Sequence, residues 1–272
     1  MIGRLFDIEH GSFVDGPGLR TVVFFKGCNL RCAWCHNPES QSRERQLAVY
    51  RDKCIVCGRC GQVCPSPAQC TLCGECELFC PSGARRCYGE DFTVAQVMEQ
   101  VEKDRDFYGD TGGVTCSGGE CMLQPDFLLA LLRECKERGI HTAVDTAGHL
   151  PYEAFERIRP MTDLFLYDLK LWDDRKHRQY VGVSNRQILD NLDRLLDSGA
   201  AVWVRIPILV GINDGEAEMR AVAAFLKGRA QRVELLPYHR MGENKYTALG
   251  LPPSVFEVPS AEQMERLRAI IT

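Results

Sequence analysis

Cysteine is the residue type that most constrains how this chain can fold. The 272-residue sequence has 15 cysteines, and twelve of them lie between Cys28 and Cys87 in short, regular runs. Such runs form disulfides in small secreted domains, whereas in a reducing compartment they bind metals. The first residues, "MIGRLFDIEHGSF", carry charges too early for a secretory signal sequence. We therefore expect a cytoplasmic protein whose clustered cysteines hold metal.

Overall composition argues against two classes of partner. The chain is 45% apolar and 26% charged, with a net charge of −4. This acidic balance gives no support for a sequence-independent nucleic-acid surface. The longest apolar stretches, such as "DFLLALL", fall far short of the roughly 20 residues that span a bilayer. We expect neither nucleic acid nor membrane as a partner.

Short segments rich in Val, Ile and Leu alternate with amphipathic segments over most of the chain. This alternation predicts an α/β fold whose parallel sheet is closed or partly closed as a barrel. Expected helices include residues 93–107, 126–139 and 185–199, and two of them end on glycine, a common C-cap residue. The expected strands are residues 20–27, 113–116, 140–145, 163–168, 201–208 and 231–236.

Residues 50–90 interrupt this alternation. The segment has two cysteine runs, three prolines, few large apolar side chains and no amphipathic period. We expect it to form an insert between the first strand and its helix, with a core too thin to hold without metal. The expected domains are therefore residues 1–49 together with 91–272, and residues 50–90.

Three cysteines follow directly on the first expected strand. Cys28, Cys32 and Cys35 would lie at its carboxyl end, where α/β barrels place their chemistry. Three thiolates can hold three irons of a four-iron cube and leave the fourth iron open to a small ligand. The alternative is a zinc ion held by these cysteines and His36, although zinc loops usually use CxxC pairs.

The CxxxCxxC spacing, with Trp34 just before its last cysteine, resembles the radical S-adenosylmethionine (SAM) superfamily. The segment "DGPGLRTVVFFKGCNLRCAWCHNPE" is more specific and is similar to glycyl radical enzyme activating enzymes as a group. The resemblance implies a partial (β/α)6 TIM-type radical SAM barrel. It also implies an oxidoreductase that cleaves SAM reductively at a 4Fe–4S cluster held by the three cysteines. The 5′-deoxyadenosyl radical would then abstract hydrogen from a backbone glycine of a partner enzyme, with a flavodoxin or ferredoxin-type protein as reductant.

Polar residues also end the later strands, and the same resemblance gives them roles. The two glycines and the glutamate of "VTCSGGEC" match the segment that holds the SAM amino group, and a carboxylate can pair with an ammonium. Asp145, Thr146 and Asp168 would ligate a monovalent cation, Na⁺ or K⁺. The expected SAM contacts are Trp34, Ser117, Gly118, Gly119, Glu120, Asp145, Lys170, Arg205 and His239.

The insert carries the run C-x2-C-x2-C-x3-C-P twice, which resembles bacterial two-cluster ferredoxins. The resemblance implies two further 4Fe–4S clusters, three in all, and a role as electron wire or docking surface. Only five residues separate the two runs, so the pairing of ligands stays open, with Cys87 as a possible substitute ligand. By the ferredoxin arrangement the ligand sets are Cys54, Cys57, Cys60 and Cys80, and Cys64, Cys70, Cys73 and Cys76.

Cys116, Cys121 and Cys135 remain, and we interpret them as small buried apolar residues. Two alternatives to an activating enzyme use parts of the same sequence. A radical SAM enzyme acting on its own small molecule would not need the segment from Asp15 to Glu39 or eight additional cysteines. An iron–sulfur electron carrier without enzyme activity would leave the polar strand ends unexplained. The sequence does not identify which glycyl radical enzyme would be the partner.

Overall fold

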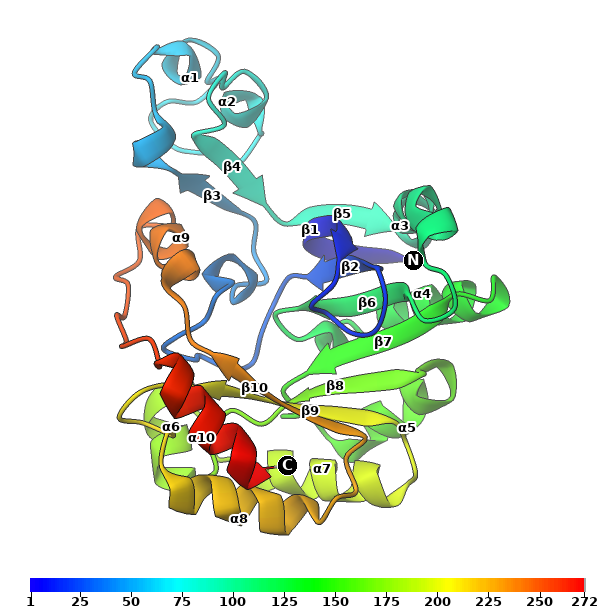
Figure 1. Ribbon diagram of the computed structural model, residues 1–272. Helices are drawn as coiled ribbons and strands as arrows, with labels where there is room; N and C mark the ends of the chain where they lie inside the picture. Colours follow the sequence, from blue (N-terminus) through cyan, green and yellow to red (C-terminus); the bar gives the residue numbers. More distant parts are fainter. Residues whose placement is uncertain (272) are drawn as a thin grey trace.

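Six parallel strands form the centre of the structure, a computed structural model that describes residues 1–271 (Figure 1). Neighbours in the sheet follow chain order, and within the described residues β10 pairs only with β9, so the barrel is partial. Both the parallel sheet and the six expected strands are confirmed. The six are β2 (Arg20–Phe25), β6 (Gly113–Gly118), β7 (His141–Thr146), β8 (Leu164–Asp168), β9 (Val202–Ile208) and β10 (Arg232–Pro237).

Two antiparallel strands that the sequence did not reveal extend the sheet beyond β2. β1 (Ile2–Ser12) pairs with β2, and β5 (Glu90–Thr93) pairs with the outer side of β1. The pairing of β1 with β2 contains two register shifts. Irregularities of this kind break the alternation of buried and exposed residues by which a strand is recognised.

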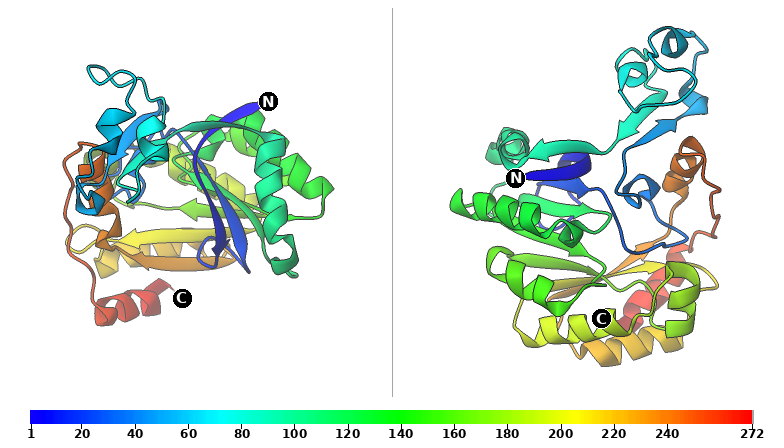
Figure 2. Two further views of the ribbon diagram at one scale, coloured as in Figure 1. Left: turned by 90° about the horizontal axis from the view of Figure 1, so that it is seen from above. Right: turned by 180° about the vertical axis from the view of Figure 1, so that it is seen from behind.

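Helices cover the outer face of the sheet (Figure 2). The expected helices are present, although the first passes at Glu102 into a 3₁₀ helix, η3 (Glu102–Phe107). Among residues 1–271, no helix combines the length and apolarity needed to cross a bilayer. The covering helices are α3 (Val94–Val101), α4 (Pro125–Glu137), α5 (Tyr152–Ile158), α6 (Asp174–Val181), α7 (Arg186–Asp197), α8 (Glu216–Leu226) and α10 (Ala261–Ile271).

The main core lies between these helices and the sheet. Leu128 and Leu132 of α4 and Leu192 of α7 are fully buried there. The three cysteines that lie outside the cysteine-rich region are fully buried as well, which confirms their interpretation as small apolar residues: Cys116, Cys121 and Cys135.

The cysteine-rich insert projects from one end of the barrel (Figure 1). Its base is a hairpin of β3 (Gln46–Val49) and β4 (Arg85–Tyr88), so the hairpin begins before residue 50. Beyond the hairpin the chain forms only η2 (Arg51–Lys53), α1 (Arg59–Gln62) and α2 (Glu75–Leu78). None of residues 51–83 is buried.

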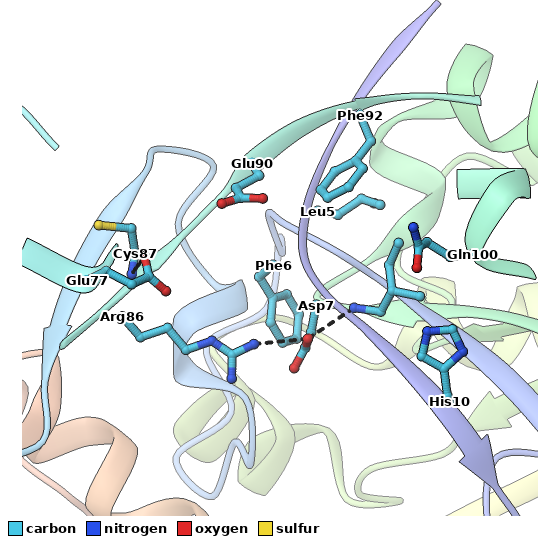
Figure 3. Close-up of a pocket in the computed structure, with 11 residues that line it drawn as sticks. Leu5, Phe6, Asp7, His10, Glu77, Arg86, Cys87, Glu90, Phe92 and Gln100 are labelled. Atoms are coloured by element: carbon cyan, nitrogen blue, oxygen red, sulfur yellow. Dashed lines mark hydrogen bonds and ion pairs between the residues drawn. The ribbon is translucent and has the colours of Figure 1, made fainter. Parts of the chain in front are cut away.

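The joint between insert and barrel is apolar at its centre and charged at its edge. Phe6 of β1 packs with Tyr50 and Tyr88 of the hairpin and with Ala248 of α9 (Glu243–Ala248). Figure 3 shows Arg86 of β4 reaching a carboxylate oxygen of Asp7 on β1, 2.9 Å away. A groove of about 240 Å³ lies beside this ion pair. The insert is therefore attached through its base alone.

Candidate active site

A cavity of about 530 Å³ opens at the carboxyl ends of the parallel strands. Side chains from the loop after β2 and from the ends of β6, β7, β8, β9 and β10 line it. Of the residues predicted for the SAM site, only Glu120 is not part of the lining. Those that line it are Cys28, Cys32, Trp34, Cys35, Ser117, Gly118, Gly119, Asp145, Thr146, Asp168, Lys170, Arg205 and His239.

The loop after β2 is held by backbone hydrogen bonds and by its own apolar residues. The backbone N–H groups of Arg31 and Ala33 donate to the carbonyl oxygens of Val181 and Tyr180, at 3.0 and 2.8 Å. Leu30 and Trp34 are buried in a small apolar cluster with residues of the neighbouring loops. Trp34 thus fixes the loop as well as lining the cavity. The three cysteines are presented by a rigid segment.

The three thiols interact with one another and are half-buried at the cavity wall. Burial, together with the neighbouring thiols, raises the pKa of Cys28 to about 11 and that of Cys32 to about 12. Burial also raises the pKa of Cys35, although the Asn37 backbone N–H and the Gln41 side chain act against it. Thiolates are the ligands of iron–sulfur clusters, and buried thiols lose their protons when metal binds. This donor set fits a cluster.

Charged groups on the other side of the cavity form one connected set. Arg205 lies between two carboxylates, with its Nη2 atom 2.5 Å from Asp145 Oδ1 and its Nε atom 3.0 Å from Asp168 Oδ1. The Lys170 Nζ atom lies 2.6 Å from Asp168 Oδ2. The Ser117 hydroxyl donates to Asp145 Oδ2 at 2.6 Å. Residues from four strand ends therefore meet, as predicted.

Burial and charge act against each other in this set. Burial would lower the pKa of Lys170, but Asp168 and the Cys32 thiol outweigh it and raise the pKa. Burial would raise the pKa of Asp168, and Arg205 with Lys170 bring it below its usual range. For Asp145, burial wins over Arg205 and the pKa is raised. Both basic groups thus stay charged beside the thiols.

Glu120 does not line the cavity, and the hydroxyl of Thr146, which does line it, is directed at Glu120. Glu120 is only 1% exposed, and its carboxylate accepts hydrogen bonds from the Thr146 hydroxyl at 2.8 Å and the Ala147 N–H at 3.2 Å. Burial raises the pKa of Glu120 to about 7. The carboxylate therefore braces the loop after β7 instead of facing the cavity. The Thr146 hydroxyl points to Glu120 and not to the two aspartates.

Gly118 and Gly119 are required by packing between two strand ends. Gly118 has a φ of +116°, and a Cβ atom there would lie 2.3 Å from the Phe25 backbone nitrogen. A Cβ atom on Gly119 would lie 2.3 Å from the Gly27 carbonyl oxygen. Only glycine allows β6 to end this close to the three-cysteine loop.

Two histidines stack at the wall of the cavity. The rings of His36 and His239 lie 3.9 Å apart, and His36 Nε2 lies 3.1 Å from the His239 carbonyl oxygen. His239 Nδ1 is buried and has no hydrogen-bond partner within residues 1–271. Over the same residues, no three Cys, His, Asp or Glu side chains converge on a position for a single metal ion. The stacking of His36 on His239 does not support its role as a zinc ligand.

Comparison with known proteins identifies the family. A model described as the radical SAM superfamily matches residues 22–223. The trans-4-hydroxy-L-proline dehydratase activating enzyme of Clostridioides difficile is 42% identical, over 98% of this chain and 95% of that protein. The choline trimethylamine-lyase activating enzyme of Oleidesulfovibrio alaskensis is 40% identical, over 98% and 94%. The chain is a radical SAM protein of the glycyl radical enzyme activating group.

A solved structure agrees with this assignment. A domain of a pyruvate-formate lyase-activating enzyme from Bacteroides vulgatus is 32% identical, with a TM-score of 0.50, over 59% of this chain and 92% of that one. The predicted family and enzyme class are confirmed. As a radical SAM protein, this activating enzyme binds a 4Fe–4S cluster and SAM, and the buried thiols and charged groups of the cavity suit both.

The insert of the activating enzyme repeats itself in structure as it does in sequence. Val56 and Leu72, at equivalent positions of the two cysteine runs, have φ values of +54° and +55°. The helices α1 and α2 each follow a glycine in the left-handed region, Gly58 and Gly74. Of the eight cysteines in the runs, four are exposed and four half-buried, and none forms a disulfide.

Cys87, the possible substitute ligand, sits apart from these runs on β4. It is buried, and its backbone N–H donates to the Glu77 carboxylate at 2.8 Å. Burial, with the Glu77 carboxylate and the Cys76 thiol, raises its pKa to about 11. Its neighbours are therefore Glu77 and one run cysteine.

Several cavity residues were missed by the sequence reasoning. Asp15, Asn37 and Gln41 line the cavity, as do Tyr238 and Met241. The first three belong to or directly follow the segment that resembles activating enzymes, so their position beside Cys28 and Cys35 was available as a signal. Tyr238 and Met241 follow β10 and offered no such spacing.

Proposed function

We propose that the 530 Å³ cavity binds SAM beside a cluster held by Cys28, Cys32 and Cys35, and that the enzyme activates a partner by forming a glycine-centred radical. When bound, the cluster and SAM supply the redox chemistry, a reductive cleavage of SAM that yields the 5′-deoxyadenosyl radical. One observation carries the proposal. Three half-buried thiols line the same cavity as two acids and two bases, of which Arg205 is buried and Asp145, Asp168 and Lys170 are half-buried.

The charged set suits a zwitterionic ligand. SAM presents an ammonium and a carboxylate, and the set offers Asp145 and Asp168 to the first and Lys170 and Arg205 to the second. The unpartnered Nδ1 atom of His239 is available to a ribose hydroxyl. Since these groups are buried, their interaction with a ligand is little weakened by solvent.

The predicted monovalent cation belongs to this proposal as well. Asp145, Thr146 and Asp168 are its candidate ligands, and Arg205 bridges the two aspartates. Cation binding would therefore require Arg205 to give up one of its two aspartate contacts and to pair with the SAM carboxylate instead. We expect SAM to bind more weakly when Na⁺ and K⁺ are replaced by tetramethylammonium. Equal affinity in both salts, measured by equilibrium dialysis, would remove the cation from the proposal.

The insert, residues 50–90, is proposed to hold two further clusters and to pass electrons from a flavodoxin or ferredoxin-type reductant. Its support is the structural repeat around Val56 and Leu72 and the exposed position of half of its run cysteines. Anaerobically reconstituted protein should contain about 12 iron atoms, four per cluster. The variant Cys57→Ala should weaken activation of the partner more than SAM binding. A content near four irons contradicts the insert clusters.

The central test is the variant Cys32→Ala. Because its thiol is one of only three ligands, SAM cleavage should be abolished while the insert clusters remain visible by electron paramagnetic resonance (EPR). Cys135→Ala is the matched control, since this cysteine is buried in the main core and does not line the cavity. Retained SAM cleavage in Cys32→Ala would refute the site.

The partner is best sought with a panel of glycyl radical enzymes. The two relatives named above differ by only two percentage points in identity, 42% and 40%, yet are named for different partners. An EPR assay that mixes the reduced enzyme, SAM and each candidate should give a glycine-centred doublet with one of them. No doublet with any glycyl radical enzyme, together with turnover of a small molecule, would favour a radical SAM enzyme that acts alone.

A further inference from the structure

The short helix α9 is fastened to the segment that follows Cys35. It packs against η1 (Pro38–Ser40). The Lys245 Nζ atom donates to Asn37 Oδ1 at 2.9 Å and to Glu39 Oε1 at 2.6 Å. A Cβ atom on Gly242, just before α9, would lie 3.0 Å from the His36 Cα atom. The helix is thus held directly against the three-cysteine loop.

Tyr246 lies on this helix and brings a hydroxyl group to the cysteines. The hydroxyl is buried and makes no hydrogen bond with any group of residues 1–271. Burial raises the pKa of Tyr246, and the next largest contributions come from the thiols of Cys35 and Cys32. These thiols are therefore the ionisable groups that the phenol faces. The Cys35 backbone N–H acts to lower the pKa of Tyr246, although it donates its own hydrogen bond to the Cys32 carbonyl oxygen at 3.1 Å, so the hydroxyl hydrogen has no acceptor.

A buried hydroxyl without a partner destabilises a fold, so its position calls for an acceptor. Sulfur at the Cys35 corner of a cluster is such an acceptor, because the thiolates and the cluster carry negative charge. Two other groups favour negative charge at this corner, since the backbone N–H of Asn37 and the side chain of Gln41 both act to lower the pKa of Cys35. Tyr246, which is distant from Cys35 in the sequence, would add a hydroxyl donor to the groups that act on this sulfur.

We propose that the Tyr246 hydroxyl donates a hydrogen bond to sulfur at the Cys35 corner and thereby raises the reduction potential of the SAM-binding cluster. The inference rests on the proposed function of the three-cysteine loop. Reduction adds one negative charge to a cluster, and a hydrogen bond to its sulfur stabilises the reduced form more than the oxidised form. Tyr246 is a positioning residue, acting through the cluster on the electron that SAM cleavage requires.

The variant Tyr246→Phe tests this directly, because it keeps the ring and removes only the hydroxyl. The readout is the midpoint potential of the cluster whose EPR spectrum changes when SAM is added, measured by redox titration of the full-length, fully loaded enzyme. The midpoint should shift to a more negative value. Tyr50→Phe is the matched control, since its buried hydroxyl bonds to the Tyr88 hydroxyl at 2.7 Å in the insert joint. Its midpoint should equal that of the wild type.

An unchanged midpoint in Tyr246→Phe would overturn the hydrogen bond. If that variant fails to load iron, the wild-type chain carries the test with fluorinated tyrosine in place of tyrosine. Fluorination makes the phenol a stronger donor, so the midpoint should become more positive, and an unchanged value overturns the proposal. A wild-type enzyme with no SAM-responsive EPR signal would overturn the proposed function itself, an outcome distinct from an unmoved midpoint.

Discussion

The barrel and the insert are parts of one chain held together by different forces. In the barrel, apolar side chains such as Leu128 and Phe155 are fully buried between helices and sheet. In the insert, none of residues 51–83 is buried. Burial of apolar surface is the main stabilising contribution to a fold, at about 25 cal/mol per Å². The barrel can therefore fold on its own side chains, whereas the insert has no such core and, under the proposed function, is held by its clusters.

The backbone conformation of the insert also differs from that of a fold held by its core. Val56 adopts a φ of +54°, a conformation that β-branched residues rarely take. Leu72 adopts the same conformation at the equivalent position of the second run. Such backbone conformations persist where the surroundings impose them, and both positions lie within the cysteine runs that are proposed to hold clusters. Under the proposed function, the two clusters and not a core set the regular form of the insert.

Iron removal should have the largest effect and should separate the two regions. After anaerobic chelation, amide hydrogen exchange should become fast over residues 54–80 while the strands β6 to β9 stay protected. The reason is that the insert, in which none of residues 51–83 is buried, is the region proposed to depend on metal for its structure. Exchange-mass spectrometry at the peptide level measures both regions in one experiment. Equal protection of the insert with and without iron would show that the insert does not need iron for its structure.

The variant Asp168→Asn should produce the next largest effect, confined to the barrel. It removes the carboxylate charge that pairs with both Arg205 and Lys170 inside the cavity. Breaking a buried ion pair in this way typically lowers the free energy of unfolding by about 3–5 kcal/mol. SAM affinity should fall as well, since both bases are then misplaced. Asp91→Asn is the control, because its ion pair with Arg4 is exposed and worth at most about 1 kcal/mol. Matching losses of melting temperature in the two variants would contradict the role of burial.

Glu120→Gln should change the pH dependence of barrel stability. Burial raises the pKa of Glu120 from 4.5 to about 7, so the folded state keeps a proton that the unfolded state loses. The associated stability is fully present below pH 4.5 and is lost as the pH rises to about 7. The wild type should therefore lose on the order of 2 kcal/mol between pH 5 and 7.5 that the variant does not lose. Anaerobic melting curves at both pH values measure this difference. An equal loss of stability in the wild type and in Glu120→Gln would refute the prediction.

Arg86→Ala should have the smallest effect and probes the joint. Its ion pair with Asp7 is about 40% exposed on both sides, 43% and 40%, and such pairs contribute about 1 kcal/mol or less. The melting temperature should barely move, while the insert should become easier to cut by protease near β4. A large fall in the melting temperature would show that insert and barrel unfold as one unit.

The sequence was sufficient for the elements whose pattern is local. The six parallel strands are short, continuous apolar runs, and their polar ends pointed to the rim where the cavity lies. Contacts between distant residues were not accessible in this way. The bridge from Arg205 to Asp145 joins residues 60 positions apart. Two further features follow only from packing. Glu120 pairs with Thr146, and the six-residue helix α9 places Tyr246 beside Cys35.

The neck of the insert has a consequence for engineering. Val49 and Arg85 are register partners in the β3–β4 hairpin, so the insert leaves the barrel and returns to it at neighbouring backbone positions. A two-residue turn spliced between them would close the hairpin and excise the whole cassette without stretching the chain. The same neck offers a graft point, through which a different module can be attached to an unaltered barrel.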